Sequence, residues 1–238
     1  MTAQLLYRAR VPTLILLFAG LWKINTLYPH PVIVILLNHA GLISPPLIRL
    51  SYTLSMMLYM TGVWLRVSGA SILGSDIVWG GRPKARSLER NGIYRSIRHP
   101  IHLGSVLILI SLAPMNSPVS AGIILLFGIP FILFLANHED QFLLNRFPEF
   151  SEYKKTVPGF IPKCHDLGIL LHPFDKNQQA NLSSGVRSEF LNISFLGGFS
   201  GFILQETTQS FWKGFASGIV LTFLLYFLLK KKSSSRNH

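Results

Sequence analysis

Apolar segments alternate with polar, cation-rich segments along the whole chain. A helix that crosses a bilayer needs about 20 predominantly apolar residues, with some tolerance for shorter ones. The runs at 47–67, 119–138 and 211–229 meet this requirement. Shorter or interrupted apolar runs lie at 11–28, 31–44, 101–115 and 190–204. The pattern predicts an all-α protein, a polytopic bundle of transmembrane helices.

Prolines divide these runs in two informative places. Pro114 and Pro118 mark a tight reversal, so residues 101–138 are expected to form a helical hairpin with both ends on the same side of the membrane. Pro29 and Pro31 split the N-terminal run, which then contains either two short spans or one broken helix. The number of spans before residue 47 stays open.

The charge distribution strengthens the membrane interpretation. Charged residues make up 13% of the 238 residues, whereas soluble domains carry about a quarter. Lys and Arg total 22 against 10 Asp and Glu, and they concentrate in the polar gaps at 82–98, 154–163 and 230–236. The positive-inside rule places these gaps in the cytosol, at a bacterial inner membrane or the endoplasmic reticulum. Cations in this arrangement argue against a nucleic-acid partner.

Four regions follow from these patterns. The polar loop 68–98 is too long for a mere connector and is a candidate working segment. Residues 139–163 show helical spacing of aromatic and aliphatic residues, which predicts an amphipathic helix on the membrane face. The expected organisation is an N-terminal membrane region, a core, an irregular linker and a glycine-rich C-terminal hairpin with a basic tail, at 1–46, 47–163, 164–188 and 189–238.

A cationic segment directly precedes the apolar run at 101–115. It ends in Arg98, His99 and Pro100, and proline suits the first position of a helix because the missing N–H has no partner there. Arg98 and His99 are therefore expected beside the free amides of a helix N-terminus, which favours an anionic or nucleotide-like ligand. The alternative is a plain positive-inside anchor, which has no use for His-Pro.

Two acidic residues, Glu139 and Asp140, end the run at 119–138. Either they simply terminate a helix, or the hairpin returns them beside Arg98 and His99. In the second case a cationic and an anionic end share one site, which suits a zwitterionic cofactor. No metal-ligand spacing, Ser-His-Asp set or Cys-His set is evident, so no metal is expected, and the single cysteine excludes an intrachain disulfide.

The order of these motifs resembles the isoprenylcysteine carboxyl methyltransferase superfamily, and phospholipid N-methyltransferases share parts of the pattern. The resemblance covers about residues 47–163. It rests on GIYRSIRHP at 92–100, Gly104, the acidic pair, and EYKKTVP at 152–158 followed by Ile161-Pro162. Trp64-Leu65-Arg66 and Leu73-Gly74 also fit the pattern.

The resemblance implies a membrane methyltransferase that uses S-adenosylmethionine at a cytosol-facing pocket. It implies a lipophilic acceptor, a prenylcysteine-like carboxylate or a lipid, delivered from the membrane. Glu139 or Asp140 would close the site between cofactor and substrate as the catalytic acidic group. The implied cofactor-binding residues lie in a loop and at the following helix start: Arg86, Ser87, Leu88, Glu89, Tyr94, Arg98, His99, Pro100, Ile101 and His102.

Three positions depart from the family pattern. His102 stands where tyrosine is usual, residues 131–138 lack the arginine that many members carry, and Thr156 replaces an arginine before Val-Pro. The missing cations weaken the case for a carboxylate acceptor, and the acceptor stays open. Two other functions also stay open: a non-catalytic protein that keeps the scaffold, and an NADPH-dependent reductase like the sterol reductases. The sequence does not indicate an oligomeric state.

Overall fold

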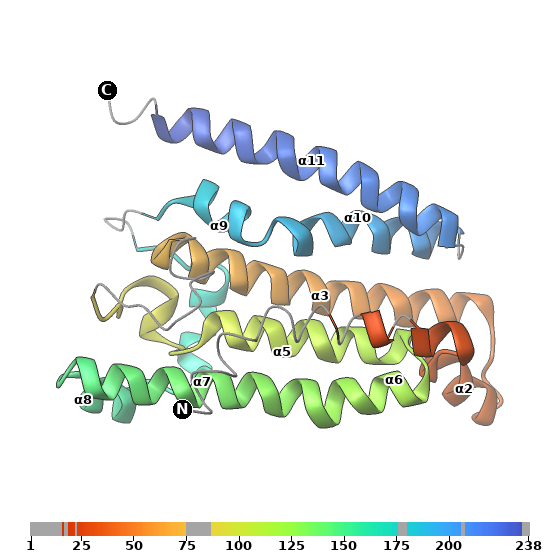
Figure 1. Cartoon of the computed structure of the whole chain (residues 1–238), viewed down its shortest axis with the longest axis horizontal. Helices are drawn as coiled ribbons and strands as arrows, with labels where there is room; N and C mark the ends of the chain where they lie inside the picture. The colour runs from red at the N-terminus through yellow and green to blue at the C-terminus, as the bar shows by residue number, and fades with distance from the viewer. Residues whose placement is uncertain are drawn as a thin grey trace.

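The computed structural model describes residues 16, 19–21, 23–74, 87–175, 180–205 and 208–234. Within these residues every regular element is helical, and the long helices lie side by side along the longest axis of the molecule (Figure 1). The α-helices are α2 (Val32–His39), α3 (Pro45–Leu73), α5 (Pro100–Leu112), α6 (Pro118–Ile123), α7 (Ile129–Arg146), α8 (Phe150–Thr156), α9 (Leu182–Ser188), α10 (Phe190–Gln205) and α11 (Thr208–Ser234).

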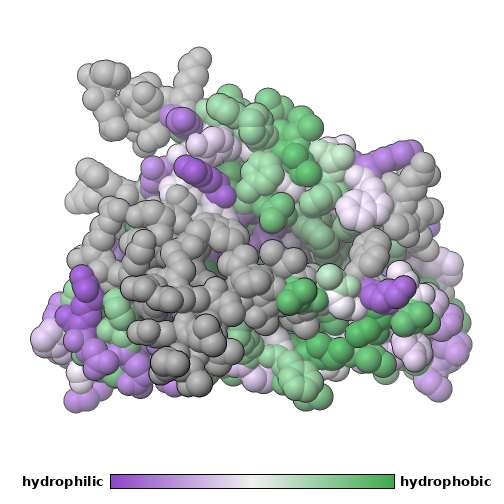
Figure 2. Space-filling view, in the orientation of Figure 1, coloured by the Kyte–Doolittle hydropathy of each residue, from purple (hydrophilic) through white to green (hydrophobic). Residues whose placement is uncertain are grey.

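Three helices of the described chain are long and apolar enough to cross a membrane. They comprise Pro45–Leu73, Pro118–Arg146 and Ser210–Lys230, and shorter apolar helices occupy Pro100–Met115 and Phe190–Ile203. Hydrophobic surface covers α11 and the α6–α7 region, while hydrophilic residues gather toward the two ends of the long axis (Figure 2). The predicted fold class, an all-α multi-pass membrane protein, is confirmed.

The predicted reversal between residues 101 and 138 is present. A 3₁₀ turn at Ala113–Met115 follows α5, and the Ser117 hydroxyl accepts a hydrogen bond from the amide of Ser120 at the start of α6. A π-helical turn at Ile124–Gly128 joins α6 to α7 directly before Pro130, whose ring nitrogen has no hydrogen to donate. One continuous helix therefore runs from Pro118 to Arg146.

This continuous helix corrects the expected amphipathic helix at 139–163. Residues 139–146 extend the membrane helix, and a separate short helix, α8, follows after a break. The break lies at Phe147, which is extended (φ −127°, ψ 106°) and precedes Pro148. A residue before proline is disfavoured in the helical region, which accounts for the stop.

The central helix α3 packs against both the motif-bearing helix and the C-terminal region. Gly62 of α3 and Gly104 of α5 lie backbone to backbone, so that a Cβ on either glycine would overlap the other's carbonyl oxygen. On another side of α3, Tyr59 stacks on Phe195 of α10 with ring centroids 6.1 Å apart. These contacts tie α5 and the C-terminal hairpin to one helix.

The segment expected to be an irregular linker, 164–188, contains two ordered pieces. A 3₁₀ helix spans Cys164–Leu170, and α9 packs closely on α3 at Gly185, opposite Val67 and Ser71. Directly after α9, the buried Glu189 forms an ion pair with Arg66 of α3, with 2.7 Å between Oε2 and Nε. A buried charge needs such a partner, and neither partner's position was evident from the sequence.

Candidate functional site

The motif segment 92–100 is anchored in the protein interior before it enters α5. Gly92 begins a 3₁₀ turn with φ +57°, a conformation that favours glycine. Ile93 and Ile97 are fully buried. The Tyr153 hydroxyl of α8 donates a hydrogen bond to the carbonyl oxygen of Tyr94. The segment is thus clamped from the α8 side, and its last residues stand at the start of α5.

The end of the α8 region pairs with the same segment through the backbone. The amide of Arg98 donates to the Pro158 carbonyl at 2.9 Å, and the amide of His99 donates to the Gly159 carbonyl at 3.0 Å. The guanidinium Nε of Arg98 donates to the carbonyl of Val157 at 3.0 Å. The two sequence motifs, 92–100 and 152–158, therefore form one structural unit.

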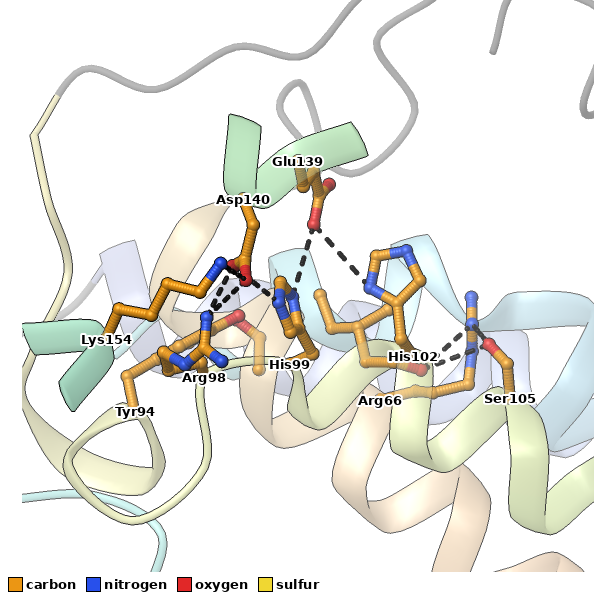
Figure 3. Close-up of polar contacts among 11 residues, drawn as sticks. Arg66, Tyr94, Arg98, His99, His102, Ser105, Glu139, Asp140 and Lys154 are labelled. Carbon is orange, nitrogen blue, oxygen red and sulfur yellow. Dashed lines mark hydrogen bonds and ion pairs between the residues drawn. The ribbon is translucent and has the colours of Figure 1, made fainter. Parts of the chain in front are cut away.

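A buried ion cluster centres on Asp140 of α7 (Figure 3). Nη1 of Arg98 lies 2.6 and 2.5 Å from the two carboxylate oxygens, and Nε2 of His99 lies 2.9 Å from Oδ1. Lys154 of α8 completes the cluster, with Nζ 3.1 Å from Oδ2. The Asp140 side chain is 7% exposed, and three donors from two other segments neutralise it.

Glu139 faces a different part of the site. Its Oε2 lies 3.7 Å from Nδ1 of His99 and 3.6 Å from Nδ1 of His102 (Figure 3). The Glu139 side chain is 31% exposed, whereas the His99 ring is only 4% exposed. The two acidic residues thus occupy distinct environments: Asp140 is enclosed by cations, and Glu139 sits at the rim beside two imidazoles.

The electrostatics of His99 follow from this position. Burial lowers the pKa of the imidazole, but hydrogen bonds and charges from Asp140 and Glu139 outweigh that effect and raise the pKa above its ordinary value. The ring is therefore favoured as a cation between two carboxylates. A cluster with both signs of charge, closely balanced, lies at the start of α5.

The remaining predicted cofactor residues are placed unevenly. The Tyr94 hydroxyl is buried and donates to the Gly69 carbonyl at 3.4 Å, and Pro100 is buried at the first turn of α5. The Ile101 carbonyl accepts a hydrogen bond from Ser105 at 3.0 Å. Ser87 donates to Glu89 at 2.8 Å beside a half-buried Leu88, and Arg86 lies outside the described residues.

Three contacts of the site region were missed in the sequence. Lys154 lies within a motif segment, but its contact with Asp140 depends on the chain reversal at Phe147. Arg66 lies inside an apolar helix, which is a signal in itself because charges are rare there; its Nη1 also hydrogen-bonds to Ser105 of α5. The grouping of His99, His102 and Glu139, where no metal-ligand spacing was seen, arises only in three dimensions.

Comparison with known proteins identifies the region that contains this site. Residues 50–149 match the phospholipid methyltransferase family model. The match spans most of α3, the motif segment, α5 and all of α6–α7, including the acidic pair. The resemblance to phospholipid methyltransferases is confirmed for these residues, and it relates this region to a family of methyltransferases.

Two curated proteins are similar over part of the chain. The cobalt-zinc-cadmium resistance protein CzcN of Cupriavidus metallidurans is 30% identical over 146 residues, covering 60% of this chain and 63% of that protein. The nickel-cobalt-cadmium resistance protein NccN of Alcaligenes xylosoxydans xylosoxydans is 29% identical over 83 residues, covering 34% and 38%. The chain thus spans less than two thirds of either relative. No solved structure matches the chain significantly.

Proposed function

We propose that this protein is an integral membrane methyltransferase that moves a methyl group from S-adenosylmethionine to a lipophilic acceptor, a prenylcysteine-like carboxylate or a lipid. The observation that carries the proposal is the ion cluster of Arg98, His99 and Asp140. All three residues lie inside the region matched by the methyltransferase family, and two family-like motifs join to form their surroundings.

The residues present fit the charges of this cofactor. S-adenosylmethionine carries an ammonium group and a carboxylate on one end. Glu139, at the exposed rim, is suited to accept hydrogen bonds from the ammonium group. Lys154 is 36% exposed and is suited to pair with the carboxylate while still contacting Asp140. Glu139 and Lys154 thus supply one negative and one positive charge at the accessible side of the cluster.

The chain's own residues are assigned positioning roles. The cofactor, when bound, supplies an electrophilic methyl group, and the protein needs only to align it with an acceptor and exclude water. Asp140 holds Arg98 and His99 in fixed orientations. These residues support the more exposed Glu139 and Lys154, which therefore do not have to reorganise when the cofactor binds. Leu126 and Phe127 on the membrane helix are exposed apolar side chains, which suits an acceptor that arrives through lipid.

Calorimetry on detergent-solubilised protein tests the proposal. The titration with S-adenosylmethionine is carried out in the presence of a chelator, so that bound metal does not contribute. Loss of one charge-assisted hydrogen bond costs about 1.5–3 kcal/mol, so Glu139→Gln should weaken binding by about 10- to 150-fold. Glu149→Gln, an exposed glutamate beyond the same helix, is the matched control and should bind as wild type.

Absence of saturable binding to the wild-type protein would contradict the cofactor assignment. A thermal shift with NADPH and none with S-adenosylmethionine would instead favour a reductase. The acceptor is sought by incubating the protein with methyl-labelled cofactor and membrane lipid extract, then identifying the labelled species. Binding of the cofactor without transfer of its methyl group to any extract or prenylcysteine analogue would favour the non-catalytic scaffold. The departures from the family pattern at His102 and Thr156 are consistent with that function.

A role in metal tolerance is a second candidate function. It is motivated by the names of the two similar proteins, which associate them with metal resistance. Expression in a metal-sensitive bacterial strain tests it, with growth measured on graded cobalt and zinc. Wild-type protein should extend growth to higher metal concentrations than Asp140→Asn produced at the same level. Equal growth of both strains would remove this candidate.

A further inference from the structure

Three potential metal-ligating side chains converge beside the ion cluster. His99 and His102 stand at the beginning of α5, and Glu139 reaches them from α7 (Figure 3). One ligand atom from each residue lies within 4.8 Å of the other two. His99 is the residue directly before α5 and His102 lies in its first turn, and both rings face Glu139 of α7. Their rings meet edge to face, with centroids 5.6 Å apart.

The two distances from Glu139 to the imidazoles approach those expected around a shared ion. Zinc binds imidazole nitrogen at about 2.0–2.1 Å and carboxylate oxygen at about 2.0–2.2 Å, so neighbouring ligands of a tetrahedral site lie roughly 3.4 Å apart. Glu139 Oε2 is 3.6 Å from His102 Nδ1 and 3.7 Å from His99 Nδ1. Both separations exceed an ordinary hydrogen bond and approach the edge of such a tetrahedron.

A supporting carboxylate orients one of the imidazoles. His99 Nε2 faces Asp140 at 2.9 Å, and Asp140 is itself held by Arg98 and Lys154. An ion that binds Nδ1 displaces the proton from that nitrogen, while the Nε2–H group goes on donating to Asp140 and keeps Nδ1 directed at Glu139. Metal-binding histidines commonly donate their second ring N–H to a carboxylate, which fixes the tautomer and the ring orientation. The contact between Asp140 and His99 Nε2 is thus a second observation, separate from the convergence of His99, His102 and Glu139.

We propose that His99, His102 and Glu139 form a binding site for one divalent transition-metal ion of the zinc and cobalt class. Imidazole with carboxylate is a ligand set suited to these ions. Three protein ligands leave a fourth position for water or another small ligand. The side chains are 4%, 12% and 31% exposed, respectively, so an ion would reach the site past Glu139. The site does not depend on the proposed methyl transfer.

Cobalt spectroscopy tests the site directly. Full-length protein without a polyhistidine tag is stripped of metal and titrated with Co²⁺ in the absence of S-adenosylmethionine. The wild-type protein should develop the visible absorption of tetrahedral Co²⁺, saturating at one ion per chain and abolished by added Zn²⁺. His102→Asn and Glu139→Gln should each lose this absorption. Asp140→Asn removes the charge of the supporting carboxylate, which also pairs with Arg98 and Lys154, and should weaken Co²⁺ binding by about 10- to 100-fold in protein that thermal unfolding shows to be folded.

Two controls separate this site from adventitious binding. His172→Asn changes an exposed histidine elsewhere, and Cys164→Ser removes the exposed thiol. Both should keep the wild-type spectrum and affinity. Thermal unfolding in detergent checks that every variant is folded. A wild-type protein without the tetrahedral band would overturn the proposal, as would a band that survives both ligand substitutions or disappears with Cys164. The calorimetric test with S-adenosylmethionine is separate, so either proposal can fail alone.

Discussion

Two regions of the described chain are held together by opposite means. Around the start of α5, charged side chains from α7 and α8 form a closed cluster on Asp140. In the C-terminal hairpin, α10 and α11 meet at glycines, and a Cβ at Gly214 would overlap the carbonyl oxygen of Gly197. Small residues that let backbones approach closely are typical of helix association in membranes.

This difference indicates that the Asp140 cluster serves ligand binding and that the C-terminal hairpin serves helix packing. The cluster needs particular charges at particular positions, because a buried charge without its partner is strongly unfavourable. The hairpin depends mainly on shape: its glycines let the backbones approach, aromatic contacts such as Phe195 with Phe211 at 5.2 Å add packing, and one uncharged hydrogen bond joins Ser194 to Thr222. Substitutions in the cluster should therefore alter ligand binding, and substitutions in the hairpin should alter stability alone.

The largest effect is expected from Asp140→Ala. Removing this carboxylate leaves Arg98 and His99 buried without their shared partner, which costs about 3–5 kcal/mol in such settings. The variant should unfold at a markedly lower temperature in detergent and lose calorimetric binding of S-adenosylmethionine. Glu152→Ala, an exposed acid on α8, is the control and should change neither quantity. Wild-type stability in Asp140→Ala would show that the cluster is not what holds this region together.

The hairpin should respond differently to Gly214→Ala. The added methyl overlaps the backbone of α10, and overpacking of this kind costs about 1–3 kcal/mol. The unfolding temperature should fall, while the affinity for S-adenosylmethionine, measured well below that temperature, should be unchanged. Gly122→Ala is the matched control, because nothing lies within 4 Å of a Cβ at that position in α6. A large loss of affinity in Gly214→Ala would show that packing of the hairpin also affects ligand binding, which would contradict the distinction between the two regions.

The sequence predicted the parts of this comparison that depend on local pattern. Lengths of apolar runs located the long helices, and His-Pro at 99–100 marked the start of α5. The predicted reversal within residues 101–138 placed Glu139 and Asp140 near Arg98 and His99, and the structure confirms that they lie there. Each of these features rests on helical spacing or on proline, both of which act within a few residues.

Other features depend on contacts across the chain and could not be predicted in this way. The pairing of Arg66 with Glu189 joins positions 123 residues apart. The division of the acidic pair, with Asp140 enclosed and Glu139 at the rim, depends on the rotation of α7 relative to α5. The position of α8 depends on the turn that Phe147 and Pro148 make after the membrane helix. The periodicity of a single sequence contains none of these orientations.

A smaller effect is expected where α8 clamps the motif segment. The Tyr153 hydroxyl donates to the Tyr94 carbonyl from a buried position, and net hydrogen bonds contribute about 1 kcal/mol. Tyr153→Phe keeps the ring and removes only this bond, so the unfolding temperature should fall slightly and the affinity modestly. Tyr28→Phe, an exposed tyrosine, provides the comparison. A stability equal to wild type would mean that the backbone pairing at Pro158 and Gly159 suffices to hold the segment.

The smallest effect on stability, and the most specific one on binding, is expected at two adjacent lysines of α8. Lys154 contacts Asp140 at 3.1 Å but is 36% exposed, so the ion pair should contribute only about 0.2–1 kcal/mol. Lys154→Ala should leave the unfolding temperature nearly unchanged and weaken binding of S-adenosylmethionine several-fold, because its charge faces the accessible side of the cluster. Lys155→Ala removes the same charge one residue further along the helix. Equal affinities in the two variants would assign any loss to net charge, and would remove Lys154 from the proposed cofactor site.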